Sequence, residues 1–368
     1  MLLVQSERNA LLAPLSATVG VVERRHTLPI LSNLLLEKKA GAVTLLATDL
    51  ELQVSTRLAD AGAGEDFAIT VSARKLFDIV RALPEGAKVK LDSKDSQVVV
   101  SAGKSRFTLQ TLPAADFPHM ETGAAVSDEI SLPQKSLKRL LQLVQFAMAS
   151  QDIRYYLNGM LLVLGGKALR VVATDGHRLS YAETTLDQEA TAREVIIPRK
   201  TVQELLKLLG DVDDPVSLRI GSNQVTIRLP DTELVTKVVD GKFPDYQRVI
   251  PQNQPRQLKV NRQTVMQALQ RASILSNEKF RGVRLIMSEN TLGIVCNNNE
   301  QEEAADEIEV QYSGDPMDVG FNVTYLLDGL GALGSEEVTL SLADANSSML
   351  LTSEGEAGFK YVVMPMRI

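Results

Sequence analysis

The chain contains few of the residues that build disulfide-stapled folds and common catalytic centres. Among 368 residues there are one cysteine, three histidines and no tryptophan, and aromatic residues make up 4%. Cys296 alone cannot form an intramolecular disulfide, and so little cysteine fits a reducing compartment, so we expect a cytoplasmic protein. No run reaches about 18 uncharged apolar residues and no basic leader opens the chain, so we expect neither a membrane span nor a signal peptide.

Motifs for catalysis and metal binding are also missing from the sequence. It has no glycine-rich phosphate loop, no Gly-x-Ser-x-Gly elbow and no His/Cys cluster at metal spacing, so we expect no cofactor and no metal. The best enzyme hypothesis is a general base at His177 beside Asp175. Gly176 marks a turn there, however, and the parallel segment at Asp49 has no histidine beside it. A structural or rim role for His177 is favoured, and we expect no enzymatic activity.

What the chain does have is a threefold internal repeat. Strand-like segments of the form apolar-x-apolar start at Leu2, Ile130 and Leu258, a spacing of 128 residues both times, and each runs into a helical apolar pattern. Ala47-Thr48-Asp49 recurs as Ala173-Thr174-Asp175. Self-similarity at a fixed period indicates repeated structural modules more readily than an enzyme with one pocket.

Each repeat has the pattern of a small α+β module. Two helical patterns alternate with many short strand-like runs, which is typical of helices packed on antiparallel sheets. The second helix starts near Ser72, Pro198 and Asn322; serine and asparagine are good N-caps, and proline suits a first helical turn. We expect three modules of a size that supports an independent core, at residues 1–125, 126–250 and 251–368.

Charge is divided unevenly between the expected helices and the rest of the chain. The net charge of −7 taken alone argues against nucleic-acid binding, which normally requires a basic surface. The six expected helices nevertheless sum to +8, which leaves −15 for everything else. If the helices share one face, that face would attract a polyanion. Solvated helices with a Lys/Arg bias explain the count about equally well. The helical windows are 7–19, 72–82, 134–149, 198–209, 261–275 and 322–333.

Module size sharpens the nucleic-acid hypothesis. A module of about 120 residues has a diameter of roughly 35 Å. Three such modules in a closed ring leave a hole of only about 5 Å, whereas six leave a hole of roughly 35 Å. One chain could therefore not encircle a duplex, but a symmetric head-to-tail pair could.

Several long strings resemble the bacterial DNA polymerase III beta subunit family, the sliding clamps. They occupy residues 151–161, 173–179, 275–284 and 361–368, and the resemblance extends over the whole chain, including its length and its threefold repeat. The family implies a ring-shaped homodimer in which each module has two helices and two antiparallel sheets. It implies a processivity factor without catalytic activity that encircles duplex DNA independently of sequence. The implied partners are the DNA polymerase III alpha subunit, the clamp loader complex, and other polymerases and repair proteins that carry short clamp-binding peptides.

The resemblance also implies a groove for partner peptides. An apolar pocket with methionines suits a surface that serves many partners. At two positions the sequence departs from the family's usual pattern, with Asn346 in place of an apolar residue and Ile368 in place of leucine. The implied groove residues are Leu157, Thr174, Gly176, His177, Arg178, Leu179, Pro244, Arg248, Val249, Asn346, Ser348, Val362, Met364, Pro365, Met366, Arg367 and Ile368.

Two further sets of residues follow from the resemblance. The residues expected to contact DNA are Arg25, Arg74, Gln151, Tyr155, Tyr156, Arg199 and Lys200. Cations there would meet phosphates without reading bases. Either tyrosine of the pair could instead pack in the core. The expected dimer seam joins Lys75, Phe107 and Leu109 of the first module to Ile274 and Leu275 of the third. The alternative is a modular scaffold that binds only proteins, which leaves the helical charge unexplained.

Overall fold

The computed structural model describes residues 1–23, 27–59, 65–121 and 129–367. Two compact units make up the chain: unit 1 comprises residues 1–137 and 203–238, and unit 2 comprises residues 138–202 and 239–368. Helices α3 (Gln134–Val144) and α4 (Arg199–Leu208) cross from one unit to the other. None of the described helices is both long and apolar enough to span a membrane.

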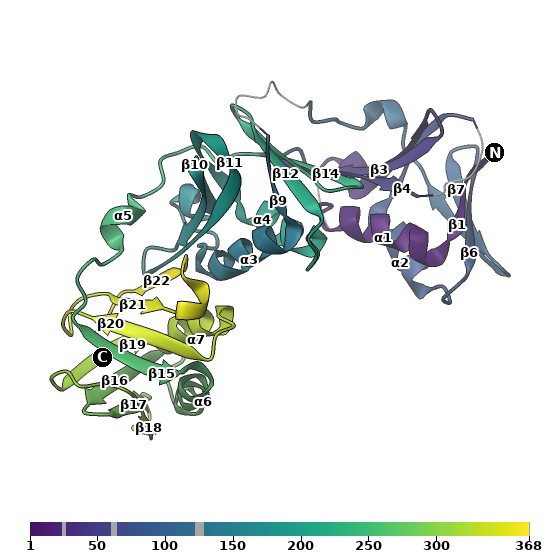
Figure 1. Cartoon of the computed structure of the whole chain (residues 1–368). Coiled ribbons are helices and arrows are strands. Elements are labelled where there is room, and N and C mark those ends of the chain that lie inside the picture. Colours follow the sequence, from purple (N-terminus) through teal and green to yellow (C-terminus); the bar gives the residue numbers. More distant parts are fainter. Residues whose placement is uncertain (24–26, 60–64, 122–128, 368) are drawn as a thin grey trace. The chain divides into compact units, whose positions relative to one another are not determined.

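Unit 1 consists of two antiparallel sheets with helices α1 (Arg8–Val19) and α2 (Ala73–Ala82) packed together (Figure 1). One sheet has the strand order β1-β6-β7-β8 and the other β5-β2-β3-β4-β14-β13-β12-β9. The strands are β1 Leu2–Glu7, β2 Asn33–Lys39, β3 Ala42–Thr48, β4 Leu52–Leu58, β5 Phe67–Ser72, β6 Lys88–Lys94, β7 Gln97–Ala102, β8 Ser105–Gln110, β9 Ile130–Pro133, β12 Pro215–Ile220, β13 Gln224–Arg228 and β14 Thr232–Lys237.

Unit 2 repeats this arrangement with α6 (Arg262–Ser273) and α7 (Val323–Ala332). Its sheets have the orders β10-β11-β22-β21-β20-β15 and β18-β17-β16-β19. A short helix, α5 (Tyr246–Val249), lies in the segment that precedes β15. The strands are β10 Gly159–Thr174, β11 Arg178–Pro198, β15 Arg256–Asn261, β16 Gly282–Ser288, β17 Thr291–Asn297, β18 Glu303–Glu309, β19 Met317–Asn322, β20 Glu337–Leu342, β21 Met349–Thr352 and β22 Lys360–Val363.

The helices form where the sequence places apolar residues at helical spacing. In α6 the buried residues are Val265, Ala268, Leu269 and Ala272, which recur every three or four positions and define one apolar face. The predicted N-cap Asn322 is confirmed, because its side-chain oxygen accepts hydrogen bonds from the backbone at the start of α7. Ser72 occupies the corresponding position before α2 but makes no side-chain capping bond.

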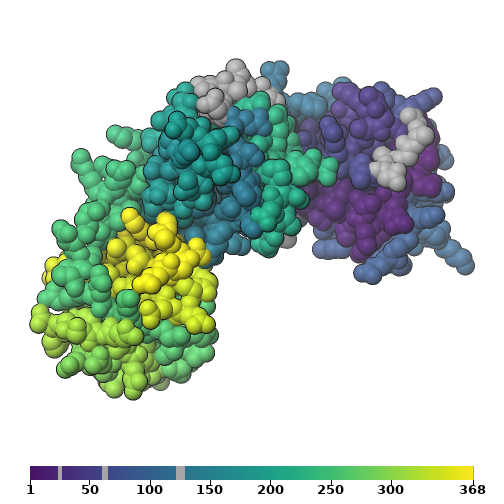
Figure 2. Space-filling model, viewed as in Figure 1, coloured from purple at the N-terminus to yellow at the C-terminus, as the bar shows by residue number. Residues whose placement is uncertain are grey.

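Two sheets continue from one sequence repeat into the next. Strand β4 of the first repeat pairs with β14 of the second, and β11 of the second pairs with β22 of the third. In Figure 2 the yellow C-terminal residues and the teal residues of unit 2 accordingly form one continuous surface. Since both pairings are antiparallel ladders, each junction between repeats is held by backbone hydrogen bonds as well as by side chains.

The turn that precedes β4 is fixed by two side chains. The Thr48 hydroxyl donates to the carbonyl of Leu52 (3.0 Å) and accepts from the backbone N–H of Leu50 (3.0 Å). The Asp49 carboxylate accepts from the N–H of Leu52 at 2.7 Å. Leu50 thereby adopts a left-handed conformation with φ of 76°, which is unusual for leucine. The sequence motif Ala-Thr-Asp therefore specifies a particular turn, and the same motif recurs in the second repeat.

Candidate functional site

A cavity of about 130 Å³ opens on unit 2 where the β10–β11 turn meets the end of β22. Its wall combines the turn, the first residues of β11, the segment through Pro244 and Val249, and Val362 with Met364. Ten of the residues expected in the peptide groove line it: Leu157, Thr174, Gly176, His177, Arg178, Leu179, Pro244, Val249, Val362 and Met364. Two lining residues, Arg154 and Tyr156, were not among those expected.

The turn at the cavity mouth repeats the hydrogen bonds of the earlier Ala-Thr-Asp motif. The Thr174 hydroxyl donates to the carbonyl of Arg178 (2.6 Å) and accepts from the N–H of Gly176 (3.1 Å). The Asp175 carboxylate accepts from the backbone N–H of His177 at 2.9 Å, so the carboxylate serves the turn. Gly176 has φ of 91°, and a Cβ there would lie 3.0 Å from the guanidinium of Arg154. Glycine at this position therefore gives Arg154 its place in the wall.

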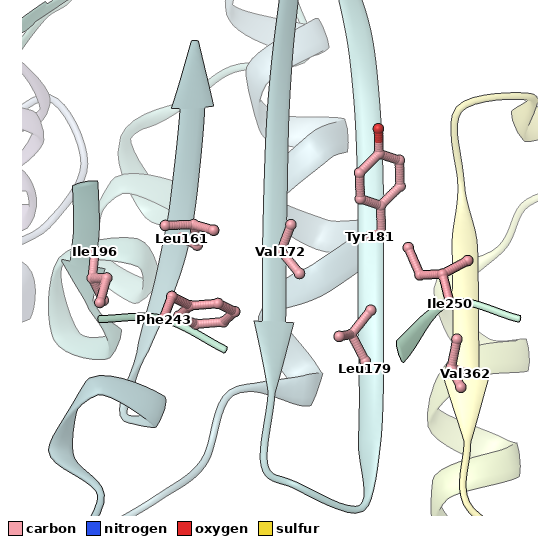
Figure 3. Packing of buried hydrophobic residues seen from close by; sticks show 8 residues of the cluster. All are labelled: Leu161, Val172, Leu179, Tyr181, Ile196, Phe243, Ile250 and Val362. Carbon is pink, nitrogen blue, oxygen red and sulfur yellow. The ribbon is translucent and has the colours of Figure 1, made fainter. Parts of the chain in front are cut away.

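The floor of the cavity belongs to a hydrophobic core that joins β10, β11 and β22 (Figure 3). Leu179 and Val362 are 1% exposed and lie opposite each other in the β11–β22 ladder. Phe243 and Ile250, from the segment on either side of α5, pack into the same cluster. The floor is therefore rigid and apolar, because it is the upper layer of a close-packed core.

Arg178 is the most buried charged residue in the cavity wall, with a side chain 10% exposed. Its guanidinium donates to Asp328 (2.6 Å), to Asp175 (3.1 Å) and to the carbonyl of Phe146 (2.7 Å). Burial alone would lower the pKa of Arg178, but Tyr361 and Asp328 raise it above its ordinary value. The cation is thus held by groups of the protein itself.

Tyr361 is packed tightly beneath this network on β22. Its hydroxyl donates to the carbonyl of Tyr325 at 2.9 Å, and its ring contacts the rings of Phe146 and Phe359. Gly329 of α7 faces the same ring, since a Cβ there would lie 2.4 Å from it. Burial raises the pKa of the Tyr361 hydroxyl well above its ordinary value. The junction between the second and third repeats therefore has no spare volume at this point.

Arg154 forms the exposed rim of the cavity. Its guanidinium donates twice to the Asp152 carboxylate, at 3.0 and 2.8 Å, and also to the carbonyl of Asp175. The hydrogen bond from Arg154 lowers the pKa of Asp152 to about 2. In the sequence Arg154 is next to Tyr155 and Tyr156, which were expected to contact DNA. No sequence pattern predicts that the Arg154 side chain contacts the turn at Gly176.

The rest of the expected groove lies elsewhere. Asn346, Pro365, Met366 and Arg367 line a second cavity of about 700 Å³ beside Arg284 and Asp318. The backbone separates the two cavities, because Met364 donates to the carbonyl of His177 whereas Met366 donates to that of Gly320.

Two other expected groove residues, Arg248 and Ser348, line neither cavity. Arg248 is exposed and pairs with Asp245 at 3.0 Å, and the carbonyl of Ser348 accepts from Gln254. Ile368 lies outside the described residues.

Two of the arginines expected to contact DNA are bound to the backbone. Arg74 donates to the carbonyl of Val22 (2.9 Å), and Arg199 donates to those of Met148 (2.7 Å) and Ala149 (3.2 Å). Both positions follow the start of the second helix of a repeat and hold the segment after the first helix. These guanidinium groups therefore have a structural task.

The other expected DNA contacts are placed differently. Tyr155 is 57% exposed, whereas Tyr156 packs against the core cluster below the cavity. Gln151 is exposed in a left-handed conformation with φ of 57°, and Lys200 is half-buried. Arg25 lies outside the described residues.

Helical cations are also compensated in part. Lys135 pairs with Asp213, Arg139 with Glu356, and Arg271 with Asp306. Each of these three acids lies outside the helical windows, so part of the helical excess of positive charge is neutralised locally.

The residues expected at the dimer seam differ in exposure. Ile274 is 78% exposed and Phe107 is 38% exposed, whereas Leu109 is 8% exposed and belongs to the core. Lys75 is exposed and Leu275 half-buried. Within the described part of the chain, β8 pairs only with β7 and β18 only with β17, so both strands present a free edge.

The described residues contain no group of three or more His, Cys, Asp or Glu side chains arranged to hold a metal ion. The Asp175 carboxylate is occupied by backbone N–H groups and by Arg178. The hypothesis of a general base at His177 therefore gains no support from this geometry.

Three domain models of the DNA polymerase III beta subunit match consecutive parts of the chain: the N-terminal domain at residues 3–121, the central domain at 131–245 and the C-terminal domain at 247–367. The beta sliding clamp of Escherichia coli K12 is 48% identical over 362 residues, covering 98% of this chain and 99% of its own length. That of Pseudomonas aeruginosa is 46% identical over 365 residues, with coverage of 98% and 99%.

Solved structures agree with these matches. The Pseudomonas aeruginosa sliding clamp bound to griselimycin superposes with a TM-score of 0.96 at 45% identity, and the Caulobacter crescentus pol III beta with 0.92 at 38%. Both comparisons cover 100% of each chain.

Proposed function

This chain belongs to the DNA polymerase III beta subunit family of DNA sliding clamps, and we propose that two copies close head to tail into a ring around duplex DNA. The family and the α+β clamp fold are established by matches along the full length. As a DNA sliding clamp, the protein tethers rather than catalyses. The division into modules at 1–125, 126–250 and 251–368, the residues of the seam and the named partners are our proposals.

The observation that carries the ring is the pattern of strand pairing between repeats. Each repeat contributes two sets of paired strands. One set ends with the last strand of the repeat, which is β8, β14 or β22, and the other set ends with β4, β11 or β18. Two of the three possible junctions are made within one chain, by β4 with β14 and by β11 with β22. The strands left over are β8 and β18, and a second copy can supply the missing partner for each.

The charges on the two free edges are complementary. Strand β18 carries four acidic residues, whereas β8 carries Arg106 and follows Lys104. Opposite charge on two edges favours their association and disfavours pairing of β18 with another β18. The exposed Phe107 and Ile274 provide apolar area for the same contact, with Lys75, Leu109 and Leu275 around it.

The seam can be tested by measuring the native mass at nanomolar concentration. Arg106→Glu, or Ile274→Ala combined with Leu275→Ala, should give monomers that are folded but lost from nicked circular DNA after loading. Wild type should be retained on the circle and released when the DNA is linearised. A variant that remains fully dimeric would place the seam on other residues.

DNA contact would be independent of sequence and weak, as a mobile clamp requires. Tyr155 is exposed and suits stacking or sugar contact, and Lys200 and Gln151 complete the proposed surface. Arg25 is proposed from the family resemblance alone and lies outside the described residues. Arg74 and Arg199 would support this surface through the backbone rather than through phosphates. Lys200→Glu should weaken retention equally on all sequences, and loss that depended on base sequence would contradict phosphate contact.

The cavity around Leu179 would bind the apolar end of a partner's peptide. It is apolar, has a rigid floor and an exposed methionine at its edge, features that suit a binding site for several partners. We propose the polymerase alpha subunit, the clamp loader and repair proteins as these partners. Micromolar affinity for a short peptide corresponds to about 8 kcal/mol net.

A fluorescent peptide with a glutamine, a leucine and a terminal apolar pair would test the groove by anisotropy. Val249→Asp should weaken binding at least about tenfold, because a carboxylate would enter the apolar wall. The matched control is Val212→Asp, an exposed valine of unit 1, which should have no effect. Equal loss in both variants, or in neither, would contradict binding in this cavity.

A further inference from the structure

We propose that Asp328 of α7, which does not line the cavity, keeps the groove open by holding the guanidinium of Arg178 away from it. The inference rests on the proposed function of this cavity as a peptide groove. It assigns a positioning role to a residue of the third repeat in a wall that belongs to the second. Arg178 would then serve the peptide with its aliphatic stem and not with its charge.

The first observation is that every nitrogen of the guanidinium donates a hydrogen bond to the protein. Nη1 donates to Asp328 at 2.6 Å, Nε donates to Asp175 at 3.1 Å, and Nη2 donates to the carbonyl of Phe146 at 2.7 Å. The same group lies over the ring of Tyr325, 4.4 Å from its centroid. Charge-assisted hydrogen bonds of this kind are stronger than neutral ones. Each of the three nitrogens therefore donates at least one hydrogen bond to the protein, and these bonds fix the direction of the group.

The second observation is the burial of Arg178 beside an open apolar cavity. Its side chain is 10% exposed, although it lines the cavity together with Leu179 and Val362. Arginine commonly covers apolar surface with its methylene stem while its charged end reaches a polar partner. Here the polar partner is Asp328 of α7, on the other side of the junction between the second and third repeats. The methylene stem of Arg178 therefore lies along the cavity wall, and the wall stays apolar.

Asp175 cannot replace Asp328 in this task. Its carboxylate already accepts the backbone N–H groups of His177 and Arg178, which hold the turn, and it contacts Arg178 only through Nε. Without Asp328 the Nη1 end would be a buried cation lacking its strongest partner. The guanidinium of Arg178 could reach water through the adjacent cavity. There it would occupy the volume in which we propose that an apolar side chain of the peptide binds.

The test measures peptide affinity for three variants with the fluorescent peptide described above. Asp328→Ala should bind about tenfold more weakly than wild type. Arg178→Met keeps an unbranched apolar stem and removes the charge, so it should bind more tightly than Asp328→Ala, in which the displaced cation enters the cavity. The double variant should bind within about twofold of Arg178→Met, because the cation that Asp328 holds is gone.

Two results would overturn the proposal. Unchanged affinity of Asp328→Ala would show that the ion pair does not shape the groove. Binding by Arg178→Met as weak as that of Asp328→Ala, persisting in the double variant, would show that the guanidinium contacts the peptide directly. If Asp328→Ala does not fold, Asp328→Leu, which fills a similar volume but has no hydrogen-bond acceptor, takes its place with the same expected order of affinities.

A second readout separates positioning from general stability. The Nε–Hε signal of Arg178 in a nitrogen-15 NMR spectrum should be sharp and protected in wild type and should broaden or shift in Asp328→Ala. The matched control is Asp78→Ala, which removes a helical carboxylate that pairs with Arg81 at 2.8 Å in unit 1 and should leave signal and affinity unchanged. If wild type itself fails to bind the peptide, the proposed groove is wrong; an unchanged signal with wild-type binding contradicts only the role of Asp328.

Discussion

Adding a single methyl group at Gly329 should destabilise the junction between the second and third repeats. A Cβ at this position of α7 would lie 2.4 Å from the ring of Tyr361, a distance that real Cβ atoms do not tolerate. The ring has little room to move, because Phe146 and Phe359 pack against it and its hydroxyl is bonded to α7. Either the helix or strand β22 must therefore shift.

Two opposing effects decide the sign of the change in stability. Replacing glycine by alanine inside a helix is worth about 1 kcal/mol in favour of the folded state. Overpacking a close-packed core costs about 1–3 kcal/mol. Because the contact is with a fully buried ring and not with a flexible chain end, the second effect should win. We expect a net loss of up to about 2 kcal/mol, with a fall in unfolding midpoint of about 2–4 °C for each kcal/mol lost.

The same helix contains its own control. Gly331 is exposed, and a Cβ there would meet nothing within 4 Å. Gly331→Ala should therefore raise the unfolding midpoint by the helix-propensity effect alone, up to about 1 kcal/mol. In thermal unfolding followed by circular dichroism, Gly329→Ala should lower the midpoint and Gly331→Ala should raise it relative to wild type. Gly329→Ala should also weaken binding of the peptide, since Val362 of the cavity wall follows Tyr361 on β22. If Gly329→Ala proved as stable as Gly331→Ala, the tight packing inferred around Tyr361 would be incorrect.

Three other outcomes are expected. Burial raises the pKa of the Cys296 thiol to about 11, so thiol reagents should modify it only as fast as the protein unfolds; rapid labelling of native protein would contradict its burial. Burial and the hydrogen bond to Glu183 raise the pKa of Tyr181 to about 12, above the value of about 10 in an unfolded chain. Its contribution to stability is complete below pH of about 10 and is lost as the pH rises towards 12, so the unfolding midpoint should fall over that range and Tyr181→Phe should flatten the fall. Tyr155→Ala should weaken retention on circular DNA without lowering the unfolding midpoint, and Tyr156→Ala should lower the midpoint; the reverse pattern would mean that Tyr156 is the contact.

Much of the fold could be predicted because the sequence contains three copies of one module pattern. The α+β class and the helical faces follow from apolar spacing, and the comparison with known clamps confirms the family that the resemblance indicated. The Ala-Thr-Asp motif predicted equivalent positions, and Thr48 and Thr174 make the same two hydrogen bonds. A pattern of this kind is local, so one sequence is enough to detect it.

The candidate site was less predictable, because side chains choose partners that are distant in sequence. Arg74 and Arg199 have the charge of a phosphate contact, but the spacing cannot show that each one reaches a backbone carbonyl some 50 residues away. Arg178 pairs with the carboxylates of Asp175 and Asp328, and Asp328 lies 150 residues later, in α7. The resemblance implied one groove for the C-terminal residues, but the backbone N–H of Met364 bonds to His177 whereas that of Met366 bonds to Gly320, and the two residues line different cavities.

The turn that follows the third strand-like run of each repeat has been put to three different uses. In the first repeat it carries Leu50, and the neighbouring Glu51 is tied to Lys237 across the β4–β14 junction at 3.0 Å. In the second it carries Gly176, which leaves space for the guanidinium of Arg154 at the cavity. In the third, Asn298 takes the place of the aspartate and accepts from the N–H of Glu302, beside the free edge of β18. The same turn, with different side chains, therefore stabilises a junction within the chain in the first repeat, borders the proposed peptide groove in the second, and precedes the edge strand of the proposed dimer seam in the third.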